Sequence, residues 1–223
     1  MNTNSVQYPI KAKVSWPSPD SICISGVRGY VSMEQMRPNS DVFIKVDLKG
    51  LKPNSLHGFH IHESPITSVL DLNIKCGGGY SDIVNTACNS CKGHFNPLNQ
   101  DHGSIFNNNK PKSMRHVGDL INNIKANELG FAKFSFYDEL VSLYPTINKP
   151  YSVIGCSLVI HRGTDDLGRE GYTPIMPFIN PKNGKPVLGS SIYDTIKYTD
   201  IRLRKSSLIN GNAGERIACG NIK

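Results

Sequence analysis

Short runs of β-forming residues, separated by turn residues, recur along the chain and constrain its fold most strongly. They fall at 10–16, 21–34, 42–48, 56–62, 118–124, 132–137, 151–161 and 215–219. Closely spaced strands with turns between them are typical of an all-β sandwich or barrel, here of about eight antiparallel strands. No stretch has a helical pattern of ordinary length. At 223 residues the chain is long enough for one well-buried core, and we expect a single domain over 1–223.

Two long stretches interrupt this pattern, and we interpret both as loops. The first, about 63–116, is rich in glycine, asparagine and serine, and the second, about 168–210, contains four prolines. Loops of this length in a compact domain are normally functional or disordered. Any binding or catalytic site is therefore expected beside them.

The histidines are concentrated in a few short motifs. His60 and His62 stand two apart in a run that reads as a strand, so both imidazoles emerge on one face, which is half of a metal site. A lone histidine is more often a hydrogen-bonded residue than a ligand, but repeated motifs favour a ligand role. All seven histidines lie in or beside polar or glycine-rich motifs: His57, His60, His62, His94, His102, His116 and His161.

Six motifs, taken in order, resemble those of the copper,zinc superoxide dismutase family. They are His-Gly-Phe-His-Ile-His-Glu (57–63), Gly-His-Phe-Asn-Pro (93–97), Asp-His-Gly (101–103), Arg-His-Val-Gly-Asp-Leu (115–120), Val-Ile-His-Arg-Gly-Thr-Asp-Asp-Leu-Gly (159–168) and Gly-Asn-Ala-Gly-Glu-Arg-Ile-Ala-Cys-Gly (211–220). The resemblance covers roughly 10–223 and implies a Greek-key β-sandwich or barrel. The long stretches would be the zinc loop and the electrostatic loop, enlarged by residues within about 64–87 and 169–207.

The resemblance implies copper and zinc as cofactors, with a ligand set for each. Copper would be bound by His60, His62, His94 and His161, and zinc by His94, His102, His116 and Asp119. Imidazole nitrogens suit copper(II), whereas zinc suits a tetrahedral set that includes a carboxylate. His94 would serve both metals, because a deprotonated imidazole offers a nitrogen on each side and releases one metal when it takes up a proton.

Three further residues receive roles from the same resemblance, and a fourth, Glu215, departs from it, because the family commonly has a small, neutral residue at its position. Asp165 would bridge His60 and His102, since metal-bound imidazoles usually donate their other N–H to an acceptor. His57 would brace the barrel and bind no metal. Arg216 would hold the anionic substrate beside copper, for which a fixed guanidinium charge is suited, and the adjacent Glu215 would lower the local positive potential.

The six cysteines allow several pairings. The Cys88-Asn-Ser-Cys91 pattern alone would suggest a redox or zinc site, but no second pair follows and no βαβ context surrounds it. The resemblance implies a disulfide between Cys88 and Cys219, which would join the zinc loop to the last strand. A further bridge between Cys76 and Cys91 stays open. Buried, unreactive thiols are expected at two strand positions, Cys23 and Cys156.

The net charge of +7, with a sequence pI near 9.1, does not by itself indicate a nucleic-acid partner. Lysines and arginines are dispersed, which favours a solvated surface or attraction of a small anion. The second long stretch has seven basic residues against three acidic ones, and its charge would speed substrate capture if it bordered the active-site channel. No secretory signal and no apolar run of about 18 residues occur, so a cytoplasmic protein without membrane contact is expected.

These observations predict an antioxidant enzyme that converts two superoxide ions into dioxygen and hydrogen peroxide. The expected partners are superoxide as substrate, a second copy of the chain packed through Ile154 and Gly155, and a copper chaperone. The main alternative is a catalytically silent relative that binds copper or a partner protein. A copper-delivery protein is disfavoured because only Cys23 precedes His57, and a copper-only enzyme because His102 and Asp119 complete the zinc set.

Overall fold

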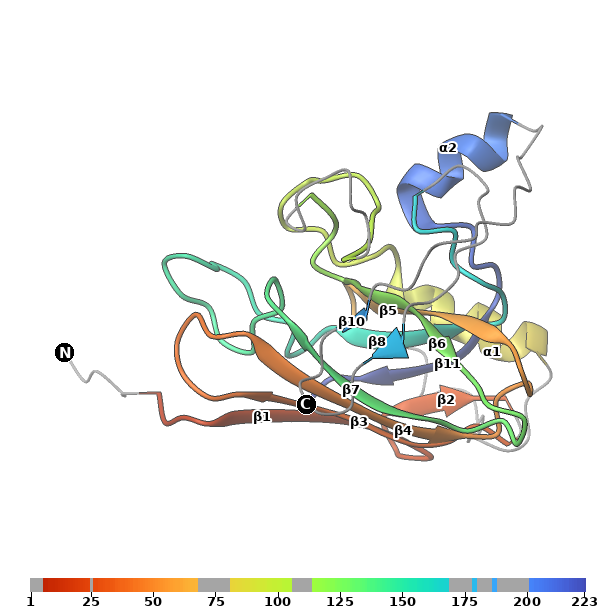
Figure 1. Cartoon of the computed structure of the whole chain (residues 1–223), viewed down its shortest axis with the longest axis horizontal. Coiled ribbons are helices and arrows are strands. Elements are labelled where there is room, and N and C mark those ends of the chain that lie inside the picture. Colours follow the sequence, from red (N-terminus) through yellow and green to blue (C-terminus); the bar gives the residue numbers. More distant parts are fainter. Residues whose placement is uncertain are drawn as a thin grey trace.

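The computed structural model describes residues 6–24, 26–67, 81–105, 114–168, 178–179, 186–187 and 201–223. Two antiparallel sheets form its two layers (Figure 1), which confirms the all-β prediction. The first sheet has the order β1-β3-β4-β7 and the second the order β2-β11-β8-β5-β6. Their strands are β1 (Ile10–Trp16), β2 (Ser21–Cys23), β3 (Arg28–Gln35), β4 (Val42–Lys49), β5 (Leu56–His62), β6 (Asp119–Lys125), β7 (Ala132–Asp138), β8 (Ser157–His161) and β11 (Arg216–Asn221).

The first sheet has one buried face and one face toward solvent. In β4 the buried residues Val42, Ile44, Val46 and Leu48 alternate with more exposed ones. Alternation with a period of two is what an antiparallel sheet with one wet face requires. Each such apolar side chain stabilises the fold by about 1.5–3 kcal/mol when fully buried. The core therefore lies between the two sheets.

The second sheet is more deeply buried and carries the polar residues of interest. Every residue of β8 is buried, as are six of the seven in β5. Strands β4 and β7 are hydrogen-bonded neighbours although β5 and β6, between them in sequence, lie in the second sheet. This connection is that of a Greek key. Within the second sheet β5 lies between β8 and β6, so the ends of these three strands lie close together.

Helices occur inside both stretches that were interpreted as loops, so the expectation of no helix is wrong there. They are α1 (Ser81–Cys88), followed by a short 3-10 helix, η2 (Asn89–Cys91), and α2 (Ile201–Asn210). Helix α1 buries Val84, Ala87 and Cys88 against the second sheet. This spacing of three and four residues is helical, but it extends over too few turns to stand out in the sequence.

Several strand limits differ from the predicted ones. The run 21–34 divides into β2 and β3, with Gly26 at a φ of +98° between them. The run 151–161 is a strand only from Ser157. Two short strands, β9 (Phe178–Ile179) and β10 (Pro186–Val187), pair with each other in the second long stretch. Most of the two segments proposed as insertions lies outside the described residues. Among those described, no helix has the length and apolar character to cross a membrane.

The cysteines confirm one predicted pairing, contradict a second, and correct the state expected for Cys23. Cys88 and Cys219 form a disulfide that ties the end of α1 to β11. Cys91 is a free, buried thiol, so the bridge considered between Cys76 and Cys91 is wrong. Cys23 is disulfide-bonded rather than an isolated thiol, and its partner lies outside the described residues. Cys156 is free and buried, as expected.

Candidate metal centre

The centre is assembled where β5, β6 and β8 end. His60 and His62 close β5, His161 closes β8, and Asp119 opens β6. The pairing of β5 with β6 shifts register between Phe59 and His60. Such irregularities re-aim side chains and are common next to functional sites. The loop between η2 and β6 supplies the remaining ligands, His94, His102 and His116.

Four buried imidazoles form the set predicted for copper. One nitrogen from each of His60, His62, His94 and His161 lies within 4.8 Å of the others. Nε2 of His62 and Nε2 of His161 are 3.5 Å apart. Nδ1 of His60 and Nε2 of His94 are buried and have no hydrogen-bond partner in the structure. Buried nitrogens without partners are costly unless a ligand satisfies them, so this set fits a bound copper ion.

The opposite ring nitrogens are held by hydrogen bonds. Nδ1 of His62 donates to the carbonyl oxygen of Lys92 at 2.8 Å, and Nδ1 of His161 donates to that of Gly214 at 2.8 Å. Nε2 of His60 donates to a carboxylate oxygen of Asp165 at 2.7 Å. Contacts of this kind fix the tautomer and the orientation of a ligating ring. The other ring nitrogens, Nδ1 of His60 and the Nε2 atoms of His62 and His161, therefore point toward one another.

A second set, predicted for zinc, surrounds one carboxylate oxygen. Oδ1 of Asp119 lies 2.8 Å from Nδ1 of His94, 3.0 Å from Nδ1 of His102 and 3.2 Å from Nδ1 of His116. The Nδ1 atoms of His102 and His116 are buried without hydrogen-bond partners. Oδ2 of Asp119 accepts the N–H groups of Gly103 and His116, which holds the carboxylate in place. Three imidazoles and one carboxylate fit a tetrahedral zinc site.

Asp165 connects the two sets. Its two carboxylate oxygens accept Nε2–H of His60 at 2.7 Å and Nε2–H of His102 at 3.0 Å. The backbone of Asp165 is itself held by the side-chain amide of Asn123, through Oδ1 and Nδ2. His57 stays outside both sets: its Nδ1 donates to the carbonyl of His161, and its Nε2 lies 3.0 Å from Oγ of Ser55.

Burial and charge set the protonation of these groups. Burial lowers the pKa of His94 to about 3, with the charge of His60 adding to the effect, and it lowers the pKa of His62 and His161 well below the usual range. For Asp119, burial alone would raise the pKa, but the charge of His102 and the hydrogen bonds from His102, His116 and His94 together outweigh burial and hold the pKa well below its usual value. Neutral imidazoles and ionised carboxylates are the forms that bind metals.

Sequence reasoning missed Arg115, a fully buried cation that supports the zinc set. Its Nη2 donates to both carboxylate oxygens of Asp138 at 3.0 Å, and its Nη1 donates to the carbonyl oxygens of His116 and Asp119. Breaking a buried ion pair by removing one partner typically costs about 3–5 kcal/mol. The available signal was the basic residue directly before a ligand histidine in Arg115-His116.

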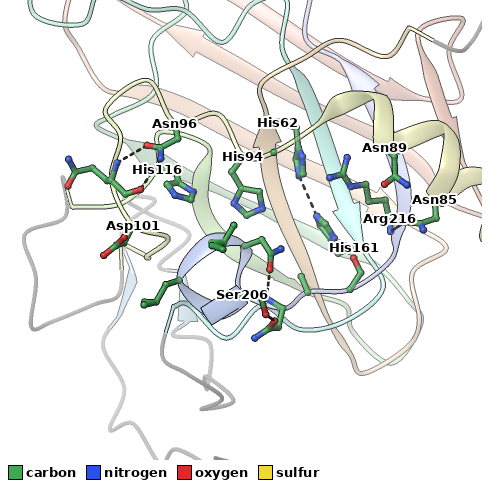
Figure 2. Close-up of a pocket in the computed structure, with 18 residues that line it drawn as sticks. His62, Asn85, Asn89, His94, Asn96, Asp101, His116, His161, Ser206 and Arg216 are labelled. Atoms are coloured by element: carbon green, nitrogen blue, oxygen red, sulfur yellow. Dashed lines mark hydrogen bonds between the residues drawn. The ribbon is translucent and has the colours of Figure 1, made fainter. Parts of the chain in front are cut away.

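A pocket opens beside the four-imidazole set (Figure 2). Ligand residues His62, His94 and His161 lie at its base, together with His116. The rest of the lining is mostly amides and small residues from the loop after α1 and from the end of α2. Arg216 and Asp101 are the two lining residues with a fixed charge among the described part of the chain. Glu215 does not line the pocket and pairs instead with Nε of Arg162 at 2.7 Å.

The fold and the site define a β-sandwich metalloprotein with two adjacent metal sites that share one histidine. The sequence matches the family described as copper/zinc superoxide dismutase (SODC) over residues 27–222. It is 34% identical to the Cu-Zn superoxide dismutases of Candida glabrata and of Saccharomyces cerevisiae, over 89% of this chain and 90% of each relative. It is 35% identical to that of Paramecium bursaria Chlorella virus 1, over 82% of this chain and 67% of the relative.

A solved structure titled as the clock protein EA4 has a similar fold. The two share 25% sequence identity with a TM-score of 0.61, and the alignment covers 98% of this chain and 97% of the other. Together with the family match, these findings show that the chain belongs to the copper/zinc superoxide dismutase family. It is an enzyme with copper and zinc as cofactors, and its activity is the dismutation of superoxide.

Proposed function

We propose that dismutation takes place at the four-imidazole set, with His94 as the residue that joins it to the zinc set. The position of the His94 ring carries this proposal. Its Nδ1 lies 2.8 Å from Asp119, whereas its Nε2 is buried, unpartnered and part of the other set. The ring is stacked on His60, with centroids 4.1 Å apart, and meets His102 edge-on at 5.1 Å. One imidazole is thus shared by both sets.

In the reaction, two superoxide ions and two protons give one dioxygen and one hydrogen peroxide. When bound by His60, His62, His94 and His161, copper would supply the one-electron chemistry, and zinc would be held by His94, His102, His116 and Asp119. Nε2 of His94 takes up a proton as the first superoxide leaves as dioxygen and gives it to the second, with the other proton coming from water. Asp165 keeps His60 and His102 in one orientation throughout, because it accepts an N–H from each.

Arg216 attracts the anionic substrate. Its guanidinium lines the pocket and is held by the carbonyl oxygens of Cys88 and Lys92, to which Nη1 and Nη2 donate. These two hydrogen bonds fix the orientation of the guanidinium and leave its other N–H groups to attract an anion. A fixed cation beside a site for an anion raises the rate of capture, and the effect weakens as salt screens the charge.

Arg216→Gln is expected to lower the rate of superoxide consumption about tenfold at low ionic strength, because it removes the fixed cation at the pocket. Copper and zinc content should stay native, since the residue binds neither metal. The comparison variant neutralises Arg202, Arg204 and Lys205 together on α2. Among the described side chains of α2, Ser206 is the first that lines the pocket, so this variant should lose only about twofold.

Metal content, measured by mass spectrometry, and cyanide-sensitive superoxide consumption over a range of salt concentrations decide the matter. Native rates in fully loaded Arg216→Gln would refute the role of Arg216. A wild-type protein with full copper and zinc that consumed no superoxide would instead identify a catalytically silent relative.

We also propose a homodimer that packs through the Ile154–Gly155 face, and a copper chaperone as a transient partner. Ile154 exposes 42% of its surface although it is a large apolar residue, and the adjacent Gly155 N–H is bonded to the carbonyl of Ile222. An apolar side chain presented on a fixed backbone suits a self-complementary contact. Sedimentation equilibrium would contradict the dimer if it gave the mass of one chain at micromolar concentration.

A further inference from the structure

The backbone of Arg216 sits at an irregularity in the sheet. In the pairing of β11 with β8, Arg216 faces His161 and Ala218 faces Ile160, so the register shifts between them. A bulge of this kind leaves one residue out of the regular ladder. The N–H of Arg216 is bonded to a side chain instead: it donates to Oδ1 of Asn85 at 2.9 Å.

Asn85 belongs to the same segment that holds the guanidinium of Arg216. It lies on α1, whereas the two carbonyl acceptors, those of Cys88 and Lys92, lie at the end of α1 and just after η2. Asn85 is half-buried and lines the pocket, where Figure 2 shows it beside Arg216. The segment therefore forms hydrogen bonds with both the backbone and the side chain of Arg216: Asn85 accepts its backbone N–H, and the two carbonyl oxygens accept from its guanidinium.

The other attachments of α1 to the sheet do not reach Arg216 itself. Val84 and Ala87 pack against the sheet, and the disulfide joins Cys88 to Cys219, three residues farther along β11. These contacts keep the helix docked when the Asn85 side chain is shortened. Alanine is also the best helix former, so the change does not weaken α1 itself. Loss of the amide should thus relax Arg216 without unfolding the segment.

We propose that Asn85 is a positioning residue for superoxide capture, which acts by fixing the backbone of Arg216 and so the place of its guanidinium over the pocket. This inference rests on the role proposed for Arg216. Asn85 lies outside the six motifs from which the ligands and Arg216 were predicted. Asn85 accepts the backbone N–H of Arg216 directly beside the bulge at Ile217, and this contact gives Asn85 a specific role.

The test uses metal-loaded full-length protein with Asn85→Ala, Asn85→Asp and, as a matched control, Thr86→Ala at the next and exposed position of α1. Asn85→Ala should lower both the rate of superoxide consumption and the affinity for azide about threefold to tenfold, the range for one lost hydrogen bond. Azide is a small anion whose binding to copper is followed by absorption. Metal content should be native, and Thr86→Ala should match the wild type in every measurement.

Asn85→Asp separates positioning from general packing. Its carboxylate still accepts the Arg216 N–H but adds a negative charge, so the rate should be low at low salt and approach the wild type at high salt, where Asn85→Ala stays slow. In an Arg216→Gln background, Asn85→Ala should weaken azide binding no further. Native azide affinity in Asn85→Ala, with Arg216→Gln impaired, would overturn the inference alone. Native behaviour of Arg216→Gln would overturn the role of Arg216 as well.

Discussion

We expect His94→Ala to lower the rate of superoxide consumption at least about a hundredfold and to remove most of the bound zinc. The reason is that this one substitution removes a ligand from both metal sites. In the folded protein Asp119 would face only His102 and His116, and Nδ1 of His60 would lose its neighbour in the four-imidazole set. Among the described residues, no other side chain is a member of both ligand sets. The loss should therefore exceed that of any other single ligand substitution.

Mass spectrometry of metal content, together with pulse-radiolysis rates, measures this effect. The matched control is His57→Gln, which changes a different buried histidine, one on β5 that belongs to neither set. It should retain both metals and most of the rate. Near-native turnover and full zinc occupancy in His94→Ala would refute a shared histidine and require two independent metal sites.

Cys219→Ser lowers the free energy of unfolding by about 4–5 kcal/mol, the chain-entropy value for a cross-link that closes a loop longer than 100 residues. The disulfide spans a sequence separation of 131 and lies in a buried apolar cluster with Val84 and Val159. Activity should fall too, because the carbonyl of Cys88 holds the guanidinium of Arg216. Urea unfolding, with wild type and variant at equal metal occupancy, measures the stability term.

Cys91→Ser is the control for this prediction, since Cys91 is a free buried thiol in the same cluster. It should cost much less stability than Cys219→Ser. The free energies of unfolding of the Cys88/Cys219 double variant and of Cys219→Ser should agree within a few tenths of a kcal/mol, because both variants lack the same bond. A non-reducing peptide map that links Cys91 to Cys219 would contradict the assigned bridge.

Short runs of β-forming residues between turn residues predicted most of the strands. The runs at 42–48 and 56–62 coincide closely with β4 and β5. The short motifs around His60, His94 and His161 likewise indicated which residues would meet, although they lie far apart in the chain. Their spacing and order carried that information through the resemblance to one family.

Other features depend on contacts that no local pattern encodes. Helix α1 is held by Val84 and Ala87 against the second sheet, so its stability comes from packing rather than from helix propensity. The bond between Arg115 and Asp138 joins residues 23 positions apart, and neither residue alone predicts the pair. The pairing of Cys23 was missed for the same reason, since cysteine connectivity cannot be deduced from sequence spacing.

The sequence by itself predicted the all-β class, because short runs of β-forming residues recur along it. Its ordered motifs predicted the residues of the two metal sets and the disulfide between Cys88 and Cys219 through their resemblance to one family. Only the tertiary structure showed which residues hold Arg216 and the buried Arg115 in place. Asn85 contacts Arg216 across 131 positions, and Arg115 reaches Asp138 across 23. Such contacts arise only when the sheets pack and bring the strand ends together, because their geometry depends on every element between them.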